Sequence, residues 1–141
     1  MELKVNGKIQ YAFRQPRFPI ICAVGDELIS ARSAVGFQRQ IERFEFQSSE
    51  ILDVVDATGE GWSFHADLMI VSLKKRWTKS AIIRLFNESE NARRIGVAYP
   101  ETSLSGKSVS RIITDVAALV AYATPNRPPQ RIRARSARPS R

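Results

Sequence analysis

The sequence predicts an α+β protein in which an antiparallel sheet of about five or six strands (residues 2–73) is packed by two C-terminal helices (about 78–89 and 105–122). Two observations support this fold. Short apolar runs and period-two alternation fill the first half, and a helical period of 3.6 residues is clear only in the second half. A chain of 141 residues is long enough to bury a core without disulfides or metals.

The formal net charge of +8 is unevenly distributed. Residues 1–73 hold seven Lys and Arg against ten Asp and Glu, residues 74–123 hold nine against four, and residues 124–141 hold six against none. The basic character therefore belongs to the C-terminal half. Cys22 is the only cysteine and is expected to be buried and reduced, and the start MELKVNGKIQ has no apolar signal segment. We therefore expect a cytoplasmic protein without a membrane-spanning helix.

The chain begins with a pattern that is typical of a hairpin. Residues 2–13, ELKVNGKIQYAF, alternate around the turn signal Asn6-Gly7. A three-residue loop, which pairs Leu3 with Tyr11, gives a consistent apolar face, whereas a two-residue loop sets apolar residues opposite polar ones. We therefore expect the three-residue loop.

The following segments differ in the strength of their patterns. The run PIICAV (19–24) is typical of a buried strand, and after a turn at 25–27 the segment LISAR (28–32) is a weaker strand candidate. Residues 33–40 show no clear period. The segment IERFEF (41–46) alternates and is predicted to be a strand.

The strongest strand signal is a pair of segments, ILDVVDA and WSFHADLMIVSL, joined by the loop 58–61. A four-residue loop pairs Ala57 with Trp62, and one face is then apolar except for Asp53. This register predicts a polar opposite face that carries Asp56, Ser63, His65 and Asp67. A hydrolytic relay on a flat sheet face would lack an oxyanion hole, so we expect a structural histidine and predict no catalytic, metal or cofactor site.

Two helices are predicted in the C-terminal half. The first, TKSAIIRLFNES, begins at the N-cap Thr78, and the second has Ser105 as its cap. Residues 91–95 fit either one more helical turn or the start of a strand that ends before Pro100. The second helix has the clearest apolar stripe of the chain, formed by Val109, Ile112, Ile113, Val116 and Val120.

The last segment, TPNRPPQRIRARSARPSR, has a composition unlike the rest of the chain. Four prolines and six arginines leave almost nothing apolar to bury. We therefore predict one folded domain over residues 1–123 and a disordered basic tail over residues 124–141.

The start of the second helix resembles two motifs, a phosphate-binding loop and a DNA-binding helix-turn-helix, and its sequence supports neither. The Gly-Lys-Ser at 106–108 has the layout of a phosphate-binding loop, but Glu101 stands where the leading glycine belongs and would repel the anion. A helix-turn-helix would present Lys107 and Arg111 to DNA, but the connection over 96–104 exceeds its usual turn of ~3–4 residues. We expect a capped helix start with a solvated basic face.

The charge distribution indicates a small non-enzymatic module that binds nucleic acid, DNA or RNA, or another polyanion through its basic C-terminal half and tail. The alternative is a protein-interaction or self-association module that uses a sheet edge and has no nucleic-acid role. No cofactor and no membrane partner are expected. The candidate nucleic-acid-binding residues are Lys74, Lys75, Arg76, Lys79, Arg93, Arg94, Lys107, Arg111, Arg127, Arg131, Arg133 and Arg135.

Overall fold

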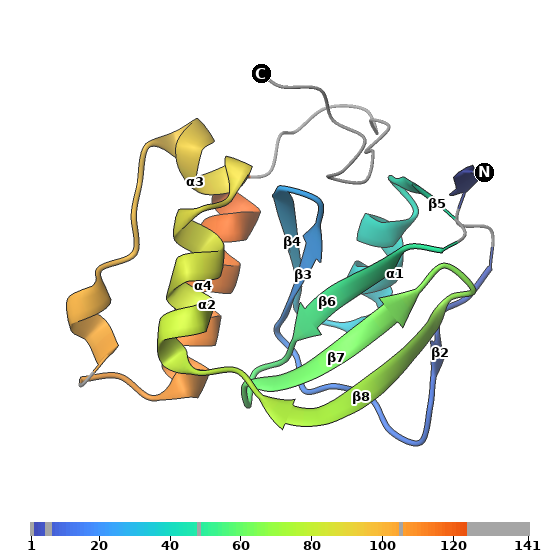
Figure 1. Ribbon diagram of the computed structural model, residues 1–141, viewed down its shortest axis with the longest axis horizontal. Coiled ribbons are helices and arrows are strands. Elements are labelled where there is room, and N and C mark those ends of the chain that lie inside the picture. Colours follow the sequence, from blue (N-terminus) through green and yellow to red (C-terminus); the bar gives the residue numbers. More distant parts are fainter. Residues whose placement is uncertain (1, 5–6, 48, 105, 124–141) are drawn as a thin grey trace.

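The computed structural model describes residues 2–4, 7–47, 49–104 and 106–123, and the predicted tail and the predicted cap Ser105 lie outside these ranges. A six-stranded sheet has the order β2-β8-β7-β6-β3-β4, and β1 pairs separately with β5 (Figure 1). The strands are β1 (Glu2–Lys4), β2 (Gln10–Tyr11), β3 (Ile20–Val24), β4 (Glu27–Ala31), β5 (Glu45–Gln47), β6 (Ile51–Val55), β7 (Glu60–His65) and β8 (Met69–Arg76). The helices are α1 (Ala34–Ile41), α2 (Lys79–Asn87), α3 (Glu90–Ile95), the 3-10 helix η1 (Glu101–Leu104) and α4 (Val109–Ala123).

The α+β class is confirmed, but the sheet is mixed rather than purely antiparallel. Strand β2 runs parallel to β8, with Tyr11 opposite Ile70, while the other neighbours in the sheet are antiparallel. The predicted hairpin over residues 2–13 is wrong, because its two strands pair with other strands and not with each other. Its first strand pairs with β5, with Leu3 opposite Phe46, and its second strand pairs with β8. Because an isolated two-stranded hairpin is marginal in water, pairing with distant strands that already belong to a core is more stable.

Both faces of the sheet centre are covered by helices. Figure 1 shows α2, α3 and α4 grouped on one side of the curved sheet and α1 on the other. Along β3, Ile20 and Cys22 belong to the core that contains α1, while Ile21 belongs to the core that contains α2 and α4. A strand covered on both faces needs a continuous apolar run, which is why PIICAV has one. Burial also raises the pKa of the Cys22 thiol, which keeps it protonated and unreactive.

Helix α1 was not predicted, and its sequence explains why. Only Phe37 and Ile41 are buried, so its apolar stripe is a single pair one turn apart. The clearest local signal is Ser33, whose Oγ accepts a hydrogen bond from the backbone N–H of Gly36 at 3.0 Å. The predicted strand over 41–46 is correspondingly shorter and starts only at Glu45.

The predicted pairing of residues 51–73 has the wrong register. Trp62 lies opposite Val54, not Ala57, and the second segment is two strands, β7 and β8, joined by a turn at 66–68. Asp56 closes a shorter loop than predicted: its backbone N–H donates to the carbonyl oxygen of Glu60 at 3.0 Å, and its carboxylate accepts from the Glu60 N–H at 3.1 Å. Gly59 in that loop has a φ of +89°, and an added Cβ would lie 2.7 Å from the Val109 side chain, so only glycine fits there.

The two predicted C-terminal helices are present, with shifted bounds for the second. Thr78 caps α2 by accepting from the N–H of Ala81 at 3.1 Å, as predicted. Helix α4 begins at Val109, later than expected, and the Ser108 Oγ accepts from the N–H of Arg111 at 3.1 Å. The open alternative at 91–95 is resolved as helix α3. The apolar stripe of α4 is confirmed, because Ile112, Ile113, Val116 and Val120 are fully buried.

One edge of the main sheet, β4, is closed by a side chain from α3. The buried amide of Asn91 accepts from the N–H of Leu28 at 2.7 Å and donates to the carbonyl oxygen of Leu28 at 3.0 Å. The amide group therefore makes the two hydrogen bonds that a neighbouring strand would make. At Leu28, the β4 edge is thus covered by a side chain of the same chain.

Replacing Asn91 with Ala should lower the free energy of unfolding by about 2–4 kcal/mol, because it leaves a buried N–H and a buried C=O without partners. Urea unfolding monitored by circular dichroism measures the change. Arg93→Ala is the matched control on the same helix, where the lost ion pair with Glu90 is exposed and its removal should cost less than ~1 kcal/mol. Equal losses in the two variants would contradict the role of Asn91.

Candidate nucleic-acid interface

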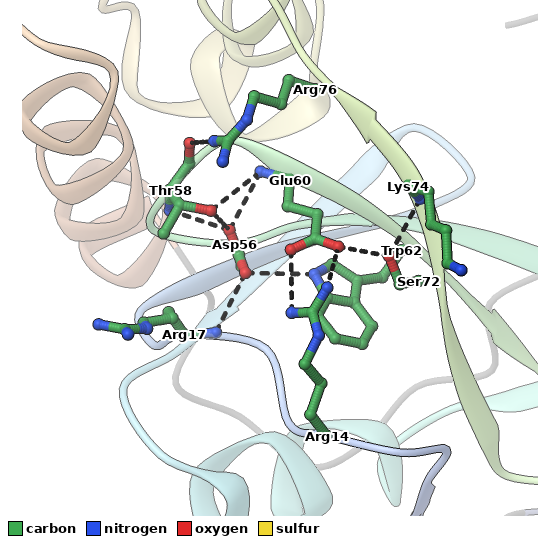
Figure 2. A network of polar contacts seen from close by, with 9 residues as sticks. All are labelled: Arg14, Arg17, Asp56, Thr58, Glu60, Trp62, Ser72, Lys74 and Arg76. Atoms are coloured by element: carbon green, nitrogen blue, oxygen red, sulfur yellow. Dashed lines mark hydrogen bonds and ion pairs between the residues drawn. The ribbon is translucent and has the colours of Figure 1, made fainter.

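A connected network of charged groups lies where the β6–β7 loop meets the end of β8 and the segment that follows β2. Figure 2 shows Asp56 and Glu60 at its centre, with Arg14, Arg17 and Arg76 around them. These residues come from three separate parts of the sequence. The network therefore joins the N-terminal segment, the loop and the last strand of the sheet into one surface.

Asp56 is fully buried and holds the three parts together. Its carboxylate accepts hydrogen bonds from the backbone N–H groups of Arg17 at 3.1 Å and Glu60 at 3.1 Å. It also accepts from the N–H and the hydroxyl of Thr58, at 2.9 and 2.7 Å, and from the indole N–H of Trp62 at 3.2 Å. The prediction that Asp56 lies on an exposed polar sheet face is wrong, because these five donors stabilise the carboxylate inside the loop.

Glu60 is the second carboxylate and connects the network to the surface. Arg14 binds it with both guanidinium nitrogens, at 3.0 and 2.6 Å, and the Ser72 hydroxyl donates to it. The hydrogen bond from Arg14 lowers the pKa of Glu60, and the same interaction raises the pKa of Arg14. The Arg14 guanidinium also lies over the Trp62 ring, 4.9 Å from its centroid.

The end of β8 is irregular and bears three consecutive cations. Between the paired positions at Trp62 and Glu60, β7 has one residue while β8 has three, residues 73–75. The bulge gives Lys74 a φ of 57°, and the Lys74 N–H donates to the Ser72 Oγ at 3.0 Å. Lys74, Lys75 and Arg76 are all exposed as a result.

We call the five residues Arg14, Arg17, Lys74, Lys75 and Arg76 the β8 cation cluster. All five are exposed, and they outnumber the two carboxylates of the network. Arg76 donates to the carbonyl oxygen of Thr58 at 2.7 Å, and no carboxylate among the described residues pairs with the side chains of Arg17, Lys74 or Lys75. The cluster therefore keeps excess positive charge that is not neutralised within this part of the fold.

Three other predicted cations lie on the helices that follow β8: Lys79 on α2, and Arg93 and Arg94 on α3. Arg94 pairs with Glu27 at 2.5 Å and donates to the carbonyl oxygen of Ala123, and Arg93 pairs with Glu90. Lys79 is half-buried at the start of α2. The tail residues Arg127, Arg131, Arg133 and Arg135 lie outside the described residues.

Lys107 and Arg111 are held by one acidic side chain. Asp115 accepts from Lys107 and from Arg111, each at 3.1 Å, and from the Tyr99 hydroxyl at 2.7 Å. Burial raises the pKa of Asp115, but these three hydrogen bonds outweigh it and the net pKa is lowered. Lys107 and Arg111 thus share one carboxylate of α4, which offsets one of their two positive charges.

Sequence reasoning missed Arg14 and Arg17, because they stand in a half of the chain with an acidic balance. A signal was nevertheless present, since both flank Pro16 in a segment that cannot form a regular strand and must lie on the surface. What the pattern could not show is that this segment lies beside β8. That proximity depends on the hydrogen bonds of Asp56 and Glu60.

The polar residues Ser63, His65 and Asp67 do not form one hydrogen-bonded relay. The Ser63 Oγ and the His65 Nε2 are 3.0 Å apart, but Asp67 instead accepts from the Met69 N–H in the β7–β8 turn. No group of three or more metal-ligating side chains occurs among the described residues. No helix in this part of the chain is both long and apolar enough to cross a bilayer.

Comparisons with models of protein families, with curated proteins and with solved structures found no match for this chain.

Proposed function

We propose that this chain is a non-enzymatic cytoplasmic module that binds nucleic acid through the β8 cation cluster. The observation that carries the proposal is the exposure of five cations from two distant segments. Figure 2 shows Arg14, Arg17, Lys74 and Arg76 around Asp56 and Glu60, and Lys75 stands between Lys74 and Arg76 on β8. Such a surface attracts the phosphate groups of a nucleic acid whatever its base sequence. Arg14 and Arg17 add to Lys74, Lys75 and Arg76, which the amino-acid sequence already indicated. The buried network beneath gives these side chains a fixed platform.

The contribution of the C-terminal helices to the proposed site is smaller than their sequence indicates. Arg93, Arg94, Lys107 and Arg111 each have an acidic partner, and binding a phosphate would have to compete with that partner. The tail arginines remain candidates for additional phosphate binding. A variant with Arg127, Arg131, Arg133 and Arg135 changed to Ser measures that contribution in the full chain.

Charge reversal within the cluster tests the proposed function directly. Lys74→Glu with Lys75→Glu should weaken the binding of a mixed-sequence oligonucleotide at least about tenfold, because two attractive interactions become repulsive. The slope of log Kd against log salt should fall by about 2, one for each lysine that no longer neutralises a phosphate. Fluorescence anisotropy across a salt series measures both quantities.

The matched control carries the same change of charge at another place. Arg32→Glu with Arg84→Glu also replaces two exposed cations, but Arg32 follows β4, at the opposite edge of the sheet from β2 and β8, and Arg84 lies on α2. The control should lose much less affinity. If both double variants lose the same affinity, the binding follows net charge and the cluster is not the site.

The second candidate function is strand pairing at a sheet edge. Strand β2 pairs with β8 only at Met69 and Ile70, and no other described strand borders this side of β8, so this edge favours the alternative. However, a bulge and consecutive lysines are the features by which natural sheets prevent edge pairing. They support the phosphate-binding proposal over pairing with a second chain.

A further inference from the structure

Phe13 is an aromatic side chain that the fold turns outward beside the β8 cation cluster. Its ring is completely exposed, at 104% of the reference area, and it is the most exposed large apolar side chain among the described residues. Its backbone has a φ of 70°, and the N–H of Arg14 donates to the carbonyl oxygen of Ala12 at 2.8 Å. Together these define a tight three-residue turn with Phe13 at its tip.

This conformation is costly for a phenylalanine. A bulky residue with positive φ is a genuine outlier, and holding it there costs free energy. Burial would offset that cost, but the exposed ring is packed against no core. The strain is therefore not compensated within the described fold, whereas stacking on a ligand would compensate it.

The position of the ring relative to the cations follows from the hydrogen bonds. The N–H of Ala12 donates to the carbonyl oxygen of Ile70 at 3.2 Å, which keeps the turn beside β8. The next residue, Arg14, reaches Glu60, which also binds Ser72 two residues before Lys74. Phe13 therefore stands at the margin of the cluster, on a segment that two anchors hold in place.

An exposed ring at the margin of a surface with excess positive charge matches the chemistry of a single strand of nucleic acid. Cations follow the phosphates, while aromatic rings stack on bases that are free of a partner. A duplex offers only its phosphates here, because its bases are already stacked and paired. An anionic membrane would also attract the cations, but membrane-surface binding uses a broad apolar face. Among the described residues of β2, β8 and the segment between β2 and β3, the exposed large apolar side chains are Phe13 and Leu73, the latter at 40%.

We propose that Phe13 stacks on a base of single-stranded nucleic acid whose phosphates lie on the β8 cation cluster. This inference rests on the proposed function, since it names the substrate class of the same site. It predicts a preference for single strands over duplexes of equal length. The preference comes from the ring and not from the charge.

The test compares Phe13→Ala with the unaltered full chain on four probes: a mixed-sequence single-stranded 15-mer, the corresponding duplex, inorganic polyphosphate and vesicles that contain phosphatidylserine. We expect Phe13→Ala to weaken binding of the single strand by about 5- to 100-fold, as for the loss of one stacked base, with no change for the duplex or polyphosphate. Phe13→Tyr should retain the affinity. Tyr122→Ala, which removes another ring that is 79% exposed, should have no effect.

The outcomes separate the two proposals. If the unaltered chain binds duplex and polyphosphate but Phe13→Ala binds the single strand as tightly as before, the stacking inference is overturned while the phosphate site stands. If the unaltered chain binds none of the nucleic acids or polyphosphate, both proposals fall. If Phe13→Ala loses only the binding of vesicles, the ligand of the ring is a membrane surface and the single-strand inference is overturned. Because Phe13 is fully exposed, a failure of the variant to fold is not expected, and its melting curve checks this.

Discussion

Ile113→Asp is expected to abolish cooperative folding of the domain. Ile113 is fully buried in the core that α4 forms with α2, β3 and β4. A carboxylate at this position would have no partner, and burying it costs several kcal/mol or more. Since a domain of this size is stable by only about 5–15 kcal/mol, the substitution removes most or all of that margin. A thermal melt followed by near-UV circular dichroism should show no transition.

The adjacent residue provides the control. Thr114 is exposed on the opposite side of α4, so Thr114→Asp adds the same charge one position later without entering the core. We expect a change of less than ~0.5 kcal/mol, which is usual for surface substitutions. A cooperative melt in Ile113→Asp would show that α4 does not organise the core.

Asp56→Ala should lower the free energy of unfolding by about 3–5 kcal/mol. The substitution removes one carboxylate that accepts five hydrogen bonds, and the donors include the buried indole N–H of Trp62 and the backbone N–H of Glu60. The urea midpoint should fall by at least about 1 M, given a slope of ~1–3 kcal/mol per M. Asp56→Asn keeps one acceptor oxygen, so its free energy of unfolding should lie between those of the unaltered chain and Asp56→Ala.

Asp53→Ala is the matched control for Asp56. Asp53 stands on β6 three residues earlier and is exposed, so its replacement should leave the urea midpoint nearly unchanged. If Asp53→Ala and Asp56→Ala are equally destabilised, the loss comes from the charge of this region and not from the hydrogen-bond network. Asp56→Ala should also weaken nucleic-acid binding, because Arg17 is attached to the cluster through this carboxylate.

The relation between the network and the proposed function has a physical basis. Exposed cations repel one another, so a cluster of five forms only where something holds it. Here Asp56 and Glu60 hold the cluster together in different ways. Asp56 binds mainly backbone N–H groups and fixes the loops, while Glu60 pairs with Arg14 and leaves the lysines of β8 in solvent. The surface consequently keeps an excess of positive charge.

Elements whose signals are contained in one segment could be predicted from the sequence. Helices α2 and α4 each have a stripe with a 3.6-residue period, and α2 has its capping Thr78. Strand β3 has a continuous apolar run because helices cover both of its faces. In each case the pattern arises from the element's own burial, so a short window of sequence is sufficient.

Elements whose partners are distant could not be predicted. The turn signal at Asn6-Gly7 indicated a local hairpin, but β1 pairs with β5 and β2 with β8. Likewise, Asp56 closes a shorter loop between β6 and β7 than the apolar pattern favoured. Pairing and register depend on the free energy of the whole core, which a local pattern does not contain.

By itself, the sequence determined the α+β class, the position of the two C-terminal helices and the excess of positive charge. Only the tertiary structure decided which cations share a surface. It paired Lys107 and Arg111 with the single carboxylate of Asp115, and it brought Arg14 and Arg17 from the acidic half to Glu60 and Asp56, near the end of β8. The physical reason is that periodicity and capping act within a few residues, whereas electrostatic interactions depend on distances in space that the chain sets only when it is folded.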